Sequence, residues 1–319
     1  MKMLDLTVII PVYNGATVIE DVLGSLETQA YPIRKVIIVD DKSTDQSLKI
    51  VQKYKKKSHL NIALILHTKN QGLAQSYNSA LIKVQTPYVV TLMQDCVLSS
   101  DNVIEHLIMP FLKNKTLIIS CAKTINPLST WKTYNFWLKC LMERHAGRIL
   151  SGKNNSCCCY SYRTLKKIGF FNTRFYRTAG EDTDIFYRMN QIGNILEVNT
   201  LVKHIHNRNP QFGLTDYIRK ENQRAEVCGV TFSHMKDLGF INILRIFARP
   251  FILLGLIIPY MNVVSLLLIV SYAYLYTEKV YYYEIRNPRI ILLPFINIFL
   301  FISYTWYFSR GFITKKQIL

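Results

Sequence analysis

Acidic side chains stand at several points of this 319-residue sequence where they could hold a metal ion or accept a proton. Adjacent carboxylates repel each other unless a ligand or hydrogen-bond donors hold them. Mg²⁺ and Mn²⁺ need only one or two protein carboxylates when phosphate oxygens supply other ligands, and a positioned carboxylate can act as a general base. The acids in question are Asp40, Asp41, Asp95, Glu181 and Asp182.

Each of these acids also has a purely structural interpretation. The first pair could belong to a loop that caps the next helix, and a single aspartate after a strand is weak evidence of a metal site. The second pair would open a helix, where the positive end of the helix dipole stabilises carboxylates. Asp184 is expected to pair with Arg188, one helical turn further on. The residues alone leave both interpretations open.

Short apolar runs alternate with helix-like segments in the N-terminal third of the chain. Ser43, with Gln46 three residues later, has the capping-box pattern of a helix start. Strands that alternate with helices predict an α/β fold, Rossmann-like, with a mostly parallel sheet covered by helices on both faces. The predicted strands cover residues 7–12, 35–40, 62–67 and 88–93, and the predicted helices residues 17–29, 43–54, 73–83 and 100–112.

The carboxyl ends of parallel strands are where such sheets bind ligands. Asn14 and Asp40 both follow predicted strands, so they are expected at one edge of the sheet. We expect Asp41, Asp95 and Asp182 to lie around one cleft at that edge. The less regular region over residues 117–202 has a predicted strand over 117–121 and a predicted helix near Asp182. We interpret it as part of the same domain, on the side that binds the second substrate, the acceptor.

Two stretches near the C-terminus, residues 250–276 and 290–308, contain no charged residue. Each is long enough to cross about 30 Å of hydrocarbon as a helix. They predict a transmembrane hairpin, preceded by an amphipathic segment over 240–249 at the membrane surface; a pair of buried core helices is the alternative. The predicted domains are 1–239, 240–249 and 250–319. Basic residues flank the outer ends and place them in the cytosol: Arg245, Arg249, Arg310, Lys315 and Lys316.

The formal net charge of +18 predicts a polyanionic partner, and the apolar C-terminus favours membrane lipid over nucleic acid. The seven cysteines have neither disulfide nor zinc spacing, so we expect buried thiols in a reducing compartment. No apolar leader precedes the first predicted strand. The expected location is the cell membrane, multi-pass, with the catalytic domain on the cytoplasmic side.

Three motifs then occur in order: T-V-I-I-P-V-Y-N-G at 7–15, V-D-D-K-S-T-D at 39–45 and G-E-D-T-D at 180–184. Together they resemble family 2 glycosyltransferases of the GT-A fold, over roughly residues 4–235. The sequence M-Q-D-C around Asp95, with E-H-L-I-M-P-F at 105–111, is similar to the rhamnosyltransferase-like subgroup.

The resemblance implies a nucleotide-diphosphate sugar as donor and a lipid-linked or glycan acceptor. Asp41 is expected to contact the nucleotide base. Mg²⁺ or Mn²⁺ is the implied cofactor, and Asp95 alone matches the family's metal carboxylate. The implied donor-binding residues are Pro11, Tyr13, Asn14, Asp40, Asp41, Gln94 and Asp95.

The same resemblance makes Asp182 the expected general base of an inverting displacement, with Glu181 beside it. His206, or His204 before it, could join the metal site, although a structural histidine is an equally good interpretation. Two other functions stay open. A nucleotidyltransferase-like enzyme would want an early glycine-rich phosphate loop, and the loop at Asn14 has one glycine. An inactive scaffold would follow if Asp95 or Asp182 lay away from the pocket.

Overall fold

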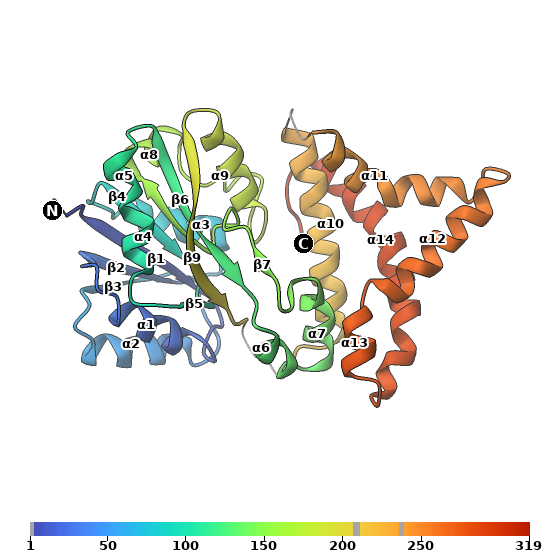
Figure 1. The fold of residues 1–319 in the computed structure, drawn as a ribbon, viewed down its shortest axis with the longest axis horizontal. Coiled ribbons are helices and arrows are strands. Elements are labelled where there is room, and N and C mark those ends of the chain that lie inside the picture. Colours follow the sequence, from blue (N-terminus) through green and yellow to red (C-terminus); the bar gives the residue numbers. More distant parts are fainter. Residues whose placement is uncertain (1–2, 207–210, 236–238) are drawn as a thin grey trace. The chain divides into compact units, whose positions relative to one another are not determined.

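A nine-stranded sheet is the framework of the N-terminal part of the chain (Figure 1). The computed structural model describes residues 3–206, 211–235 and 239–319. The strand order is β3-β2-β1-β4-β8-β6-β9-β5, with β7 beside β6. Strands β1 to β4 pair in parallel, whereas β8 and β5 are antiparallel to their neighbours. The α/β prediction is confirmed, but the sheet is mixed rather than mostly parallel.

The strands are β1 (Leu6–Val12), β2 (Lys35–Asp40), β3 (Ile62–Leu66), β4 (Tyr88–Leu92), β5 (Cys96–Leu98), β6 (Leu117–Ile125), β7 (Ile149–Leu150), β8 (Cys157–Ser161) and β9 (Asn194–His204). The helices among and beside them are α1 (Ile19–Glu27), α2 (Ser47–Lys57), α3 (Leu73–Leu81), α4 (Val103–Ile108), α5 (Pro110–Lys113), α6 (Leu128–Lys132), α8 (Tyr162–Lys167) and α9 (Glu181–Asn190).

Both faces of the sheet are covered, which explains why its central strands are apolar without alternation. Along β1, Val8 and Ile10 join a core with side chains of α1, α2 and α4. Ile9 points the other way, into a core with side chains of α3, α8 and α9. The three adjacent cysteines lie in β8 as buried free thiols, as expected.

The predicted helix start at Ser43 is wrong, because α2 begins at Ser47. Instead of capping a helix, the Ser43 hydroxyl accepts a hydrogen bond from the Asn14 backbone at 3.1 Å. Asp45 accepts one from the Ser47 backbone at 2.9 Å. The helix predicted over residues 100–112 is two helices, α4 and α5, and the second starts at Pro110.

The chain divides into two compact units, and the second is helical. The first comprises Met1–Thr130 and Gly147–Asn209, and the second Trp131–Ala146 and Pro210–Leu319. The predicted domain boundaries at residues 239 and 249 stay predictions. Helices of the second unit are α7 (Phe136–Met142), the 3₁₀ turn η1 (Glu143–His145), α10 (Leu214–His234), α11 (Phe240–Gly255), α12 (Met261–Leu275), α13 (Glu278–Tyr283), the 3₁₀ turn η2 (Pro288–Leu292) and α14 (Leu293–Thr314).

The first predicted membrane span, over residues 250–276, is not one helix. Helix α11 ends at Gly255 and α12 begins at Met261, so a turn interrupts the apolar stretch. In the part of the chain that the structure describes, one helical stretch is long and apolar enough to cross a membrane, Pro288–Thr314. The predicted pair of spans thus reduces to one candidate.

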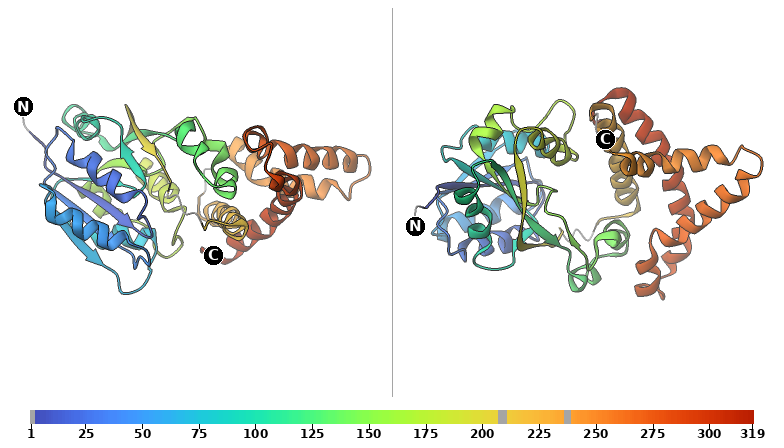
Figure 2. Two further views of the ribbon diagram at one scale, coloured as in Figure 1. Left: turned by 90° about the horizontal axis from the view of Figure 1, so that it is seen from below. Right: turned by 45° about the horizontal axis from the view of Figure 1, so that its top comes forward.

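Helices α10 and α14 pack along each other through small residues (Figure 2). A Cβ atom on Gly311 would lie 2.1 Å from the Glu226 carbonyl oxygen, and one on Gly229 would lie 2.0 Å from the Phe308 carbonyl oxygen. Ser303 donates a hydrogen bond to Asn222 at 2.9 Å in the same contact. Neither helix can accept a side chain at these glycines without moving.

We therefore expect Gly311→Ala to destabilise the second unit by about 1–3 kcal/mol, the usual cost of overpacking. Thermal unfolding followed by tryptophan fluorescence measures this, because all three tryptophans lie in that unit. Ser309→Ala, which removes one oxygen from the same helix and adds no atom, is the control. An unchanged melting temperature for Gly311→Ala would contradict the close approach of α10 and α14.

Candidate functional site

The loop after β1 is tied to the loop after β2 and to the end of β4. Asn14, with a left-handed φ of 51°, accepts a hydrogen bond from the Thr44 backbone at 2.8 Å. Gln94 exchanges two hydrogen bonds with the Tyr13 backbone, at 2.8 and 3.0 Å. Three predicted donor-binding residues, Tyr13, Asn14 and Gln94, therefore lie in loops that hold one another at one edge of the sheet. Pro11 precedes them, buried in β1.

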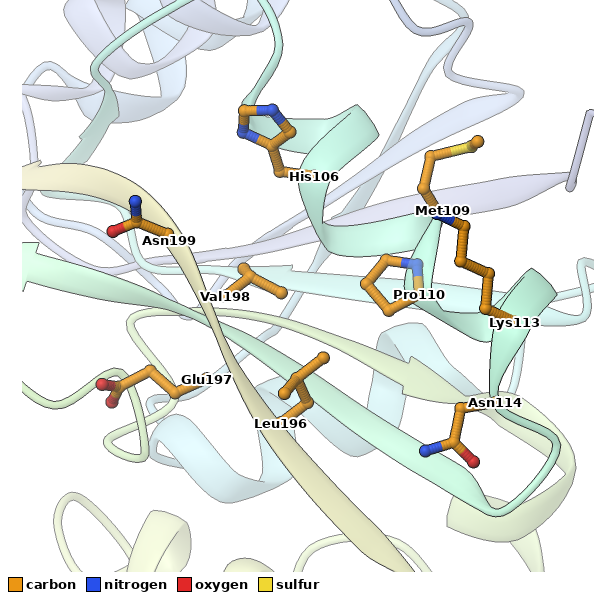
Figure 3. A pocket seen from close by; sticks show the side chains of 9 residues that line it. All are labelled: His106, Met109, Pro110, Lys113, Asn114, Leu196, Glu197, Val198 and Asn199. Carbon is orange, nitrogen blue, oxygen red and sulfur yellow. The ribbon is translucent and has the colours of Figure 1, made fainter.

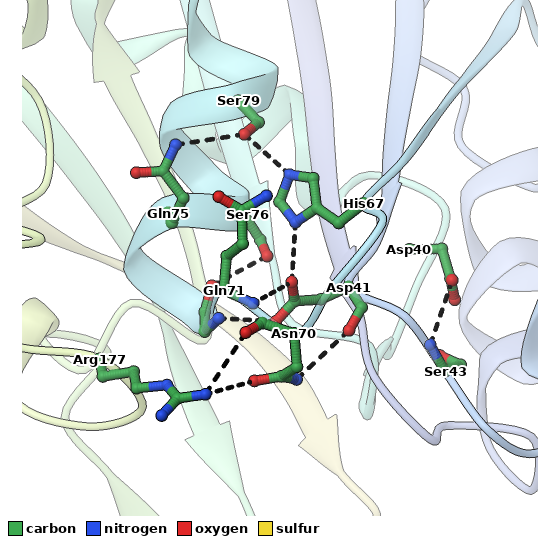
Figure 4. Close-up of polar contacts among 11 residues, drawn as sticks. Asp40, Asp41, Ser43, His67, Asn70, Gln71, Gln75, Ser76, Ser79 and Arg177 are labelled. Atoms are coloured by element: carbon green, nitrogen blue, oxygen red, sulfur yellow. Dashed lines mark hydrogen bonds and ion pairs between the residues drawn. The ribbon is translucent and has the colours of Figure 1, made fainter. Parts of the chain in front are cut away.

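Both carboxylate oxygens of Asp41 accept hydrogen bonds from other residues of the same domain (Figure 4). The backbone nitrogens of Gln71 and Gly72 donate to them at 2.8 and 2.7 Å. His67 Nδ1 lies 2.7 Å from one of these oxygens, and His67 Nε2 lies 2.9 Å from the Ser79 hydroxyl. Asp41 is 3% exposed. Its predicted contact with a nucleotide base stays a prediction, because its oxygens already hold the loop before α3.

Asp40 has a different environment from its neighbour. One carboxylate oxygen accepts a hydrogen bond from the Ser43 backbone at 3.2 Å. The other, Oδ1, is buried and has no hydrogen-bond partner among the described residues. A buried carboxylate oxygen without a donor costs free energy. Asp40 is therefore the member of the pair that keeps an unused acceptor atom.

The loop held by Asp41 is in contact with the segment that leads to α9. Asn70 donates to the Asp41 carbonyl oxygen at 3.3 Å and accepts from Arg177 at 3.3 Å. Gly72 has a left-handed φ of 89°, and a Cβ atom there would lie 2.5 Å from the Arg177 carbonyl oxygen. Only glycine suits both conditions. The end of β2 is thus linked, residue by residue, to the start of the helix that carries Glu181.

Glu181 and Asp182 open α9 as predicted, and their environments differ. Glu181 is 2% exposed and its Oε2 has no hydrogen-bond partner among the described residues. Burial and the neighbouring charge of Asp182 raise the pKa of Glu181 to about 8. Asp182 is partly exposed and, among the described residues, accepts hydrogen bonds only from Thr183, at 2.6 and 3.2 Å. Burial also raises the pKa of Asp182, and the Thr183 hydrogen bonds oppose that rise.

The predicted pair of Asp184 and Arg188 is present, but it is not a surface pair. Two guanidinium nitrogens of Arg188 donate to one Asp184 oxygen at 2.8 and 2.6 Å. Arg188 also donates to the carbonyl oxygens of Ile168 and Phe170, at 2.9 and 2.8 Å. Asp184 is buried. The pair anchors the turn after α8, and its loss should cost more than an exposed ion pair does.

Asp95 and two histidines form a cluster at the junction of β5 and β9. The Asp95 carboxylate lies 3.2 Å from His204 Nε2 and 3.3 Å from His206 Nδ1. Burial opposes ionisation of Asp95, but the charges and hydrogen bonds of both histidines hold its pKa well below the usual range. Ligand atoms of Asp95, Cys96 and His204 all lie within 4.8 Å of one another.

This cluster fits a divalent cation such as Mn²⁺. A carboxylate and imidazole nitrogens are suitable ligands that already converge on one point. Cys96 does not suit a hard cation, because burial raises the pKa of its thiol and thiolates favour softer metals. The metal set supported by the geometry is therefore Asp95 with His204 and His206, of which the sequence pattern had favoured His206.

Buried Tyr77 of α3 responds to the charges of both acidic groups. Burial raises the pKa of Tyr77, and the charge of Glu181 and, more weakly, that of Asp95 add to that rise. This agrees with a shared cleft, although the position of Asp182 relative to Asp41 and Asp95 stays a prediction. A separate cavity of about 730 Å³ lies between α4, α5 and β9 and contains none of the predicted site residues (Figure 3).

Two residues with a part in this arrangement were not singled out from the sequence. His67 follows β3 directly, so the rule that selected Asp40 and Asp95 at strand ends would have found it. Arg177 lies in an irregular segment, and its contact with Asn70 spans 107 positions of the chain. No local pattern indicates such a contact.

The sequence profile of glycosyl transferase family 2 matches residues 7–170, the region that contains β1 to β4, Asp41 and Asp95. The chain belongs to glycosyltransferase family 2. This removes the nucleotidyltransferase-like alternative. A relative, the poly(ribitol-phosphate) β-N-acetylglucosaminyltransferase TarS of Staphylococcus aureus, is 37% identical over 95 residues, 29% of this chain and 16% of that protein. The poly(ribitol-phosphate) β-glucosyltransferase of Bacillus spizizenii is 36% identical over 99 residues, 30% of this chain and 16% of that protein.

Solved glycosyltransferases share the fold at low sequence identity. The mannosyltransferase PcManGT from Pyrobaculum calidifontis, solved with GDP-Man and Mn²⁺, has a TM-score of 0.60 and 17% identity, covering 98% of this chain and 88% of that chain. S. aureus TarS 1–349 in complex with UDP-GlcNAc has a TM-score of 0.51 and 16% identity, covering 96% and 92%. The fold of this family 2 chain is thus GT-A, as predicted.

The raised pKa of Glu181 predicts a pH-dependent stability. Its folded-state pKa of about 8 lies above the ordinary 4.5, so its contribution is fully present below about pH 4.5 and is lost as the pH rises through 8. Glu181→Gln, which cannot ionise, should gain stability relative to the parent over that window. Thermal unfolding by circular dichroism between pH 5 and 9 measures the difference.

Glu197→Gln is the matched control. A hydrogen bond from Ser151 lowers the pKa of Glu197, so its contribution is present above the unfolded-state pKa and is lost only as the pH falls below it. The difference between Glu197→Gln and the parent should therefore stay constant from pH 5 to 9. If the Glu181→Gln difference were equally constant, Glu181 would not hold a proton at neutral pH.

Proposed function

We propose that this family 2 glycosyltransferase moves a sugar from a nucleotide-diphosphate sugar to a lipid-linked or glycan acceptor, by an inverting displacement at a membrane. The observation that carries the proposal is the pair of unlike acidic sites within one domain. Asp95 is held ionised between two histidines, whereas Asp182 starts a helix beside a carboxyl group that is protonated at neutral pH.

The donor side of the proposal rests on the loops at the ends of β1 and β2. Tyr13 is 45% exposed, and its ring could stack on a nucleotide base. Asp40 could accept a hydrogen bond from a base N–H through its Oδ1 atom, which removes the cost of burying that oxygen unpaired. We therefore propose Asp40 as the base-binding acid, with Asp41 holding the surrounding loop. UDP-GlcNAc in TarS and GDP-Man in PcManGT support a nucleotide-sugar donor.

A divalent cation would be held by Asp95, His204 and His206. When bound there, Mn²⁺ or Mg²⁺ neutralises negative charge on the departing diphosphate. The mixed carboxylate and imidazole ligands favour Mn²⁺ over Mg²⁺, and PcManGT was solved with Mn²⁺. Gln94 before Asp95 orients the β1 loop. The sequence Gln94-Asp95 resembles that of the rhamnosyltransferase-like subgroup, so we include that subgroup in the proposal.

On the acceptor side, we assign proton removal to Asp182. Its side chain is partly exposed and keeps one carboxylate oxygen free of hydrogen bonds from described residues. Glu181 holds a proton at neutral pH, so it is a poor base and a poor nucleophile. A single carboxylate base without a second nucleophile supports an inverting displacement. The poly(ribitol-phosphate) in the names of two relatives supports a polymeric acceptor.

Activity is tested first by a donor screen of the purified full chain. Nucleotide diphosphate release from several nucleotide sugars, with and without Mn²⁺, identifies the donor. The absence of release with every donor would favour the inactive-scaffold alternative.

Asp182→Asn should lower sugar transfer by roughly 10²- to 10⁴-fold, because a general base acts on the acceptor proton in the transition state. Donor affinity should be nearly unchanged, since the base contributes little to ground-state binding. The measurements are turnover at saturating donor and acceptor, and donor titration calorimetry. Asp21→Asn, at an exposed position of α1, is the control for loss of a carboxylate. Parent-like turnover in Asp182→Asn would place the base elsewhere, and Glu181 would be tested next.

Asp95→Asn should weaken donor binding in the presence of Mn²⁺ while leaving metal-free binding nearly unchanged. The substitution removes the only carboxylate of the proposed metal set and retains the side-chain volume. Calorimetric titration with the donor, with and without Mn²⁺, measures both affinities. Equal loss in the two titrations would mean that Asp95 acts on the fold or the donor rather than through a cation.

A further inference from the structure

Helices α11 and α12 form a hairpin within the second unit (Figures 1 and 2). The chain reverses between Gly255 and Met261, where Tyr260 has a left-handed φ of 68°. A Cβ atom on Gly255 would lie 2.2 Å from the Ser265 hydroxyl oxygen, so the two helices touch next to the turn. Ser265 is accordingly 3% exposed.

The tip of this hairpin is apolar and exposed. No charged residue occurs between Pro250 and Thr277. Ile257 is 78% exposed and Tyr260 93%. In α12 the exposed positions include consecutive residues, which point in directions about 100° apart and so surround most of the helix. These residues are Val263, Val264, Leu266, Leu267 and Leu268.

Several backbone N–H groups of the turn bond within the segment. The backbone nitrogens of Leu256, Ile257 and Ile258 donate to carbonyl oxygens of α11 at 3.2 Å each. Asn262 donates from its backbone to Ile258 at 3.1 Å and accepts from the Val263 backbone at 2.8 Å. Backbone groups that bond within the segment are the condition for irregular structure to enter hydrocarbon.

The hairpin is too short to cross a membrane. The 15 residues of α12 extend about 22 Å at 1.5 Å per residue, and α11 has only Pro250–Gly255 beyond Arg249, about 9 Å. The hydrocarbon core of a bilayer is about 30 Å thick. Both helices must therefore end on the side from which they enter.

An arginine and three tyrosines form a layer at the end of the hairpin opposite the turn, which we call the Arg249 level. The Arg249 guanidinium lies over the rings of Tyr304, Tyr272 and Tyr276, at 4.3, 4.9 and 5.7 Å. The Tyr276 hydroxyl donates to Glu221 of α10 at 2.5 Å. Arginine and tyrosine together are typical of the membrane–water interface. This level sets the depth to which the hairpin can sink.

The described contacts of α14 with the hairpin include residues near Arg249 and the C-terminal end of α12. Asn297 donates to the Ala273 carbonyl oxygen and the Thr277 hydroxyl, at 2.8 and 2.9 Å. Further along α14, Arg310 pairs with the fully buried carboxylate of Glu226 on α10 at 2.7 Å. These contacts hold α14 against α10 and the end of α12, so the tip stands alone.

We propose that α11 and α12 are a re-entrant hairpin that inserts tip-first into one leaflet of an anionic membrane and returns to the same side. A medium that surrounds the hairpin fits side chains exposed around most of α12, outside the buried stripe of Ser265, Ile269 and Ala273, whereas a protein groove would cover one face. The formal charge of +18 favours anionic headgroups at the level of Arg249. The hairpin's insertion is not part of the proposed function. It rests on that function only in assuming that the enzyme acts at a membrane.

Ile257→Cys in the full chain tests the position of the tip. The protein is added to preformed phosphatidylcholine–phosphatidylglycerol vesicles, and a membrane-impermeant maleimide is supplied either outside or trapped inside. The parent gives the background of native thiols. Lys53→Cys, at an exposed position of α2, is the control that the outer reagent must label. We expect Ile257→Cys to be unlabelled from either side and labelled after detergent.

Labelling from inside would mean that the segment spans the bilayer, and labelling from outside that the tip stays in water or meets a protein; either result overturns the proposal. Ile257→Glu should weaken flotation with the same vesicles roughly 10²-fold, from the cost of a charge in hydrocarbon, and leave nucleotide diphosphate release intact. Unchanged flotation of Ile257→Glu would also refute it. Intact insertion without turnover on any donor would count against the proposed function alone.

Discussion

The buried carboxylate of Asp41 is the interaction on which the N-terminal site depends. A carboxylate removed from water is stable only when donors replace its hydration, and here Gln71, Gly72 and His67 supply them. These donors come from the end of β3 and the start of α3, so a single carboxylate fixes both segments against the end of β2. Through Asn70 and Arg177 the same loop meets the chain just before α9.

Carboxyl side chains acquire different properties because their surroundings differ. Asp95 lies between two imidazoles that favour its charged form, and Glu181 lies in a dry environment beside another carboxylate that disfavours it. The separation of such pKa values is what assigns acidic groups to separate tasks. In this domain one environment suits a cation and the other suits proton transfer, and the charges of both raise the pKa of the same buried tyrosine, Tyr77.

The sequence predicts most of the sheet because its strands are continuous apolar runs with polar residues at their ends, and β2 has the predicted bounds of 35–40. Local sequence patterns fail to predict the structure where contacts between distant residues determine it. Ser43 has the pattern of a cap, but Asn14, 29 positions away, takes its hydroxyl as an acceptor. The uncharged run over 250–276 has the composition of a span, yet the close approach of Gly255 and Ser265 turns it into a hairpin, and hydropathy does not detect a reversal of direction.

A hairpin limited to one leaflet has a consequence for the chemistry that the whole chain performs. It would hold the enzyme at the surface where lipid-linked acceptors present their headgroups, without moving any polar group across the membrane. Attachment converts a search through solution into a search along the surface, which raises the effective concentration of acceptor without any new contact to it. The site then needs little affinity for the lipid part of the acceptor. Binding energy can instead be used on the reacting sugar, where contacts made only in the transition state increase the rate.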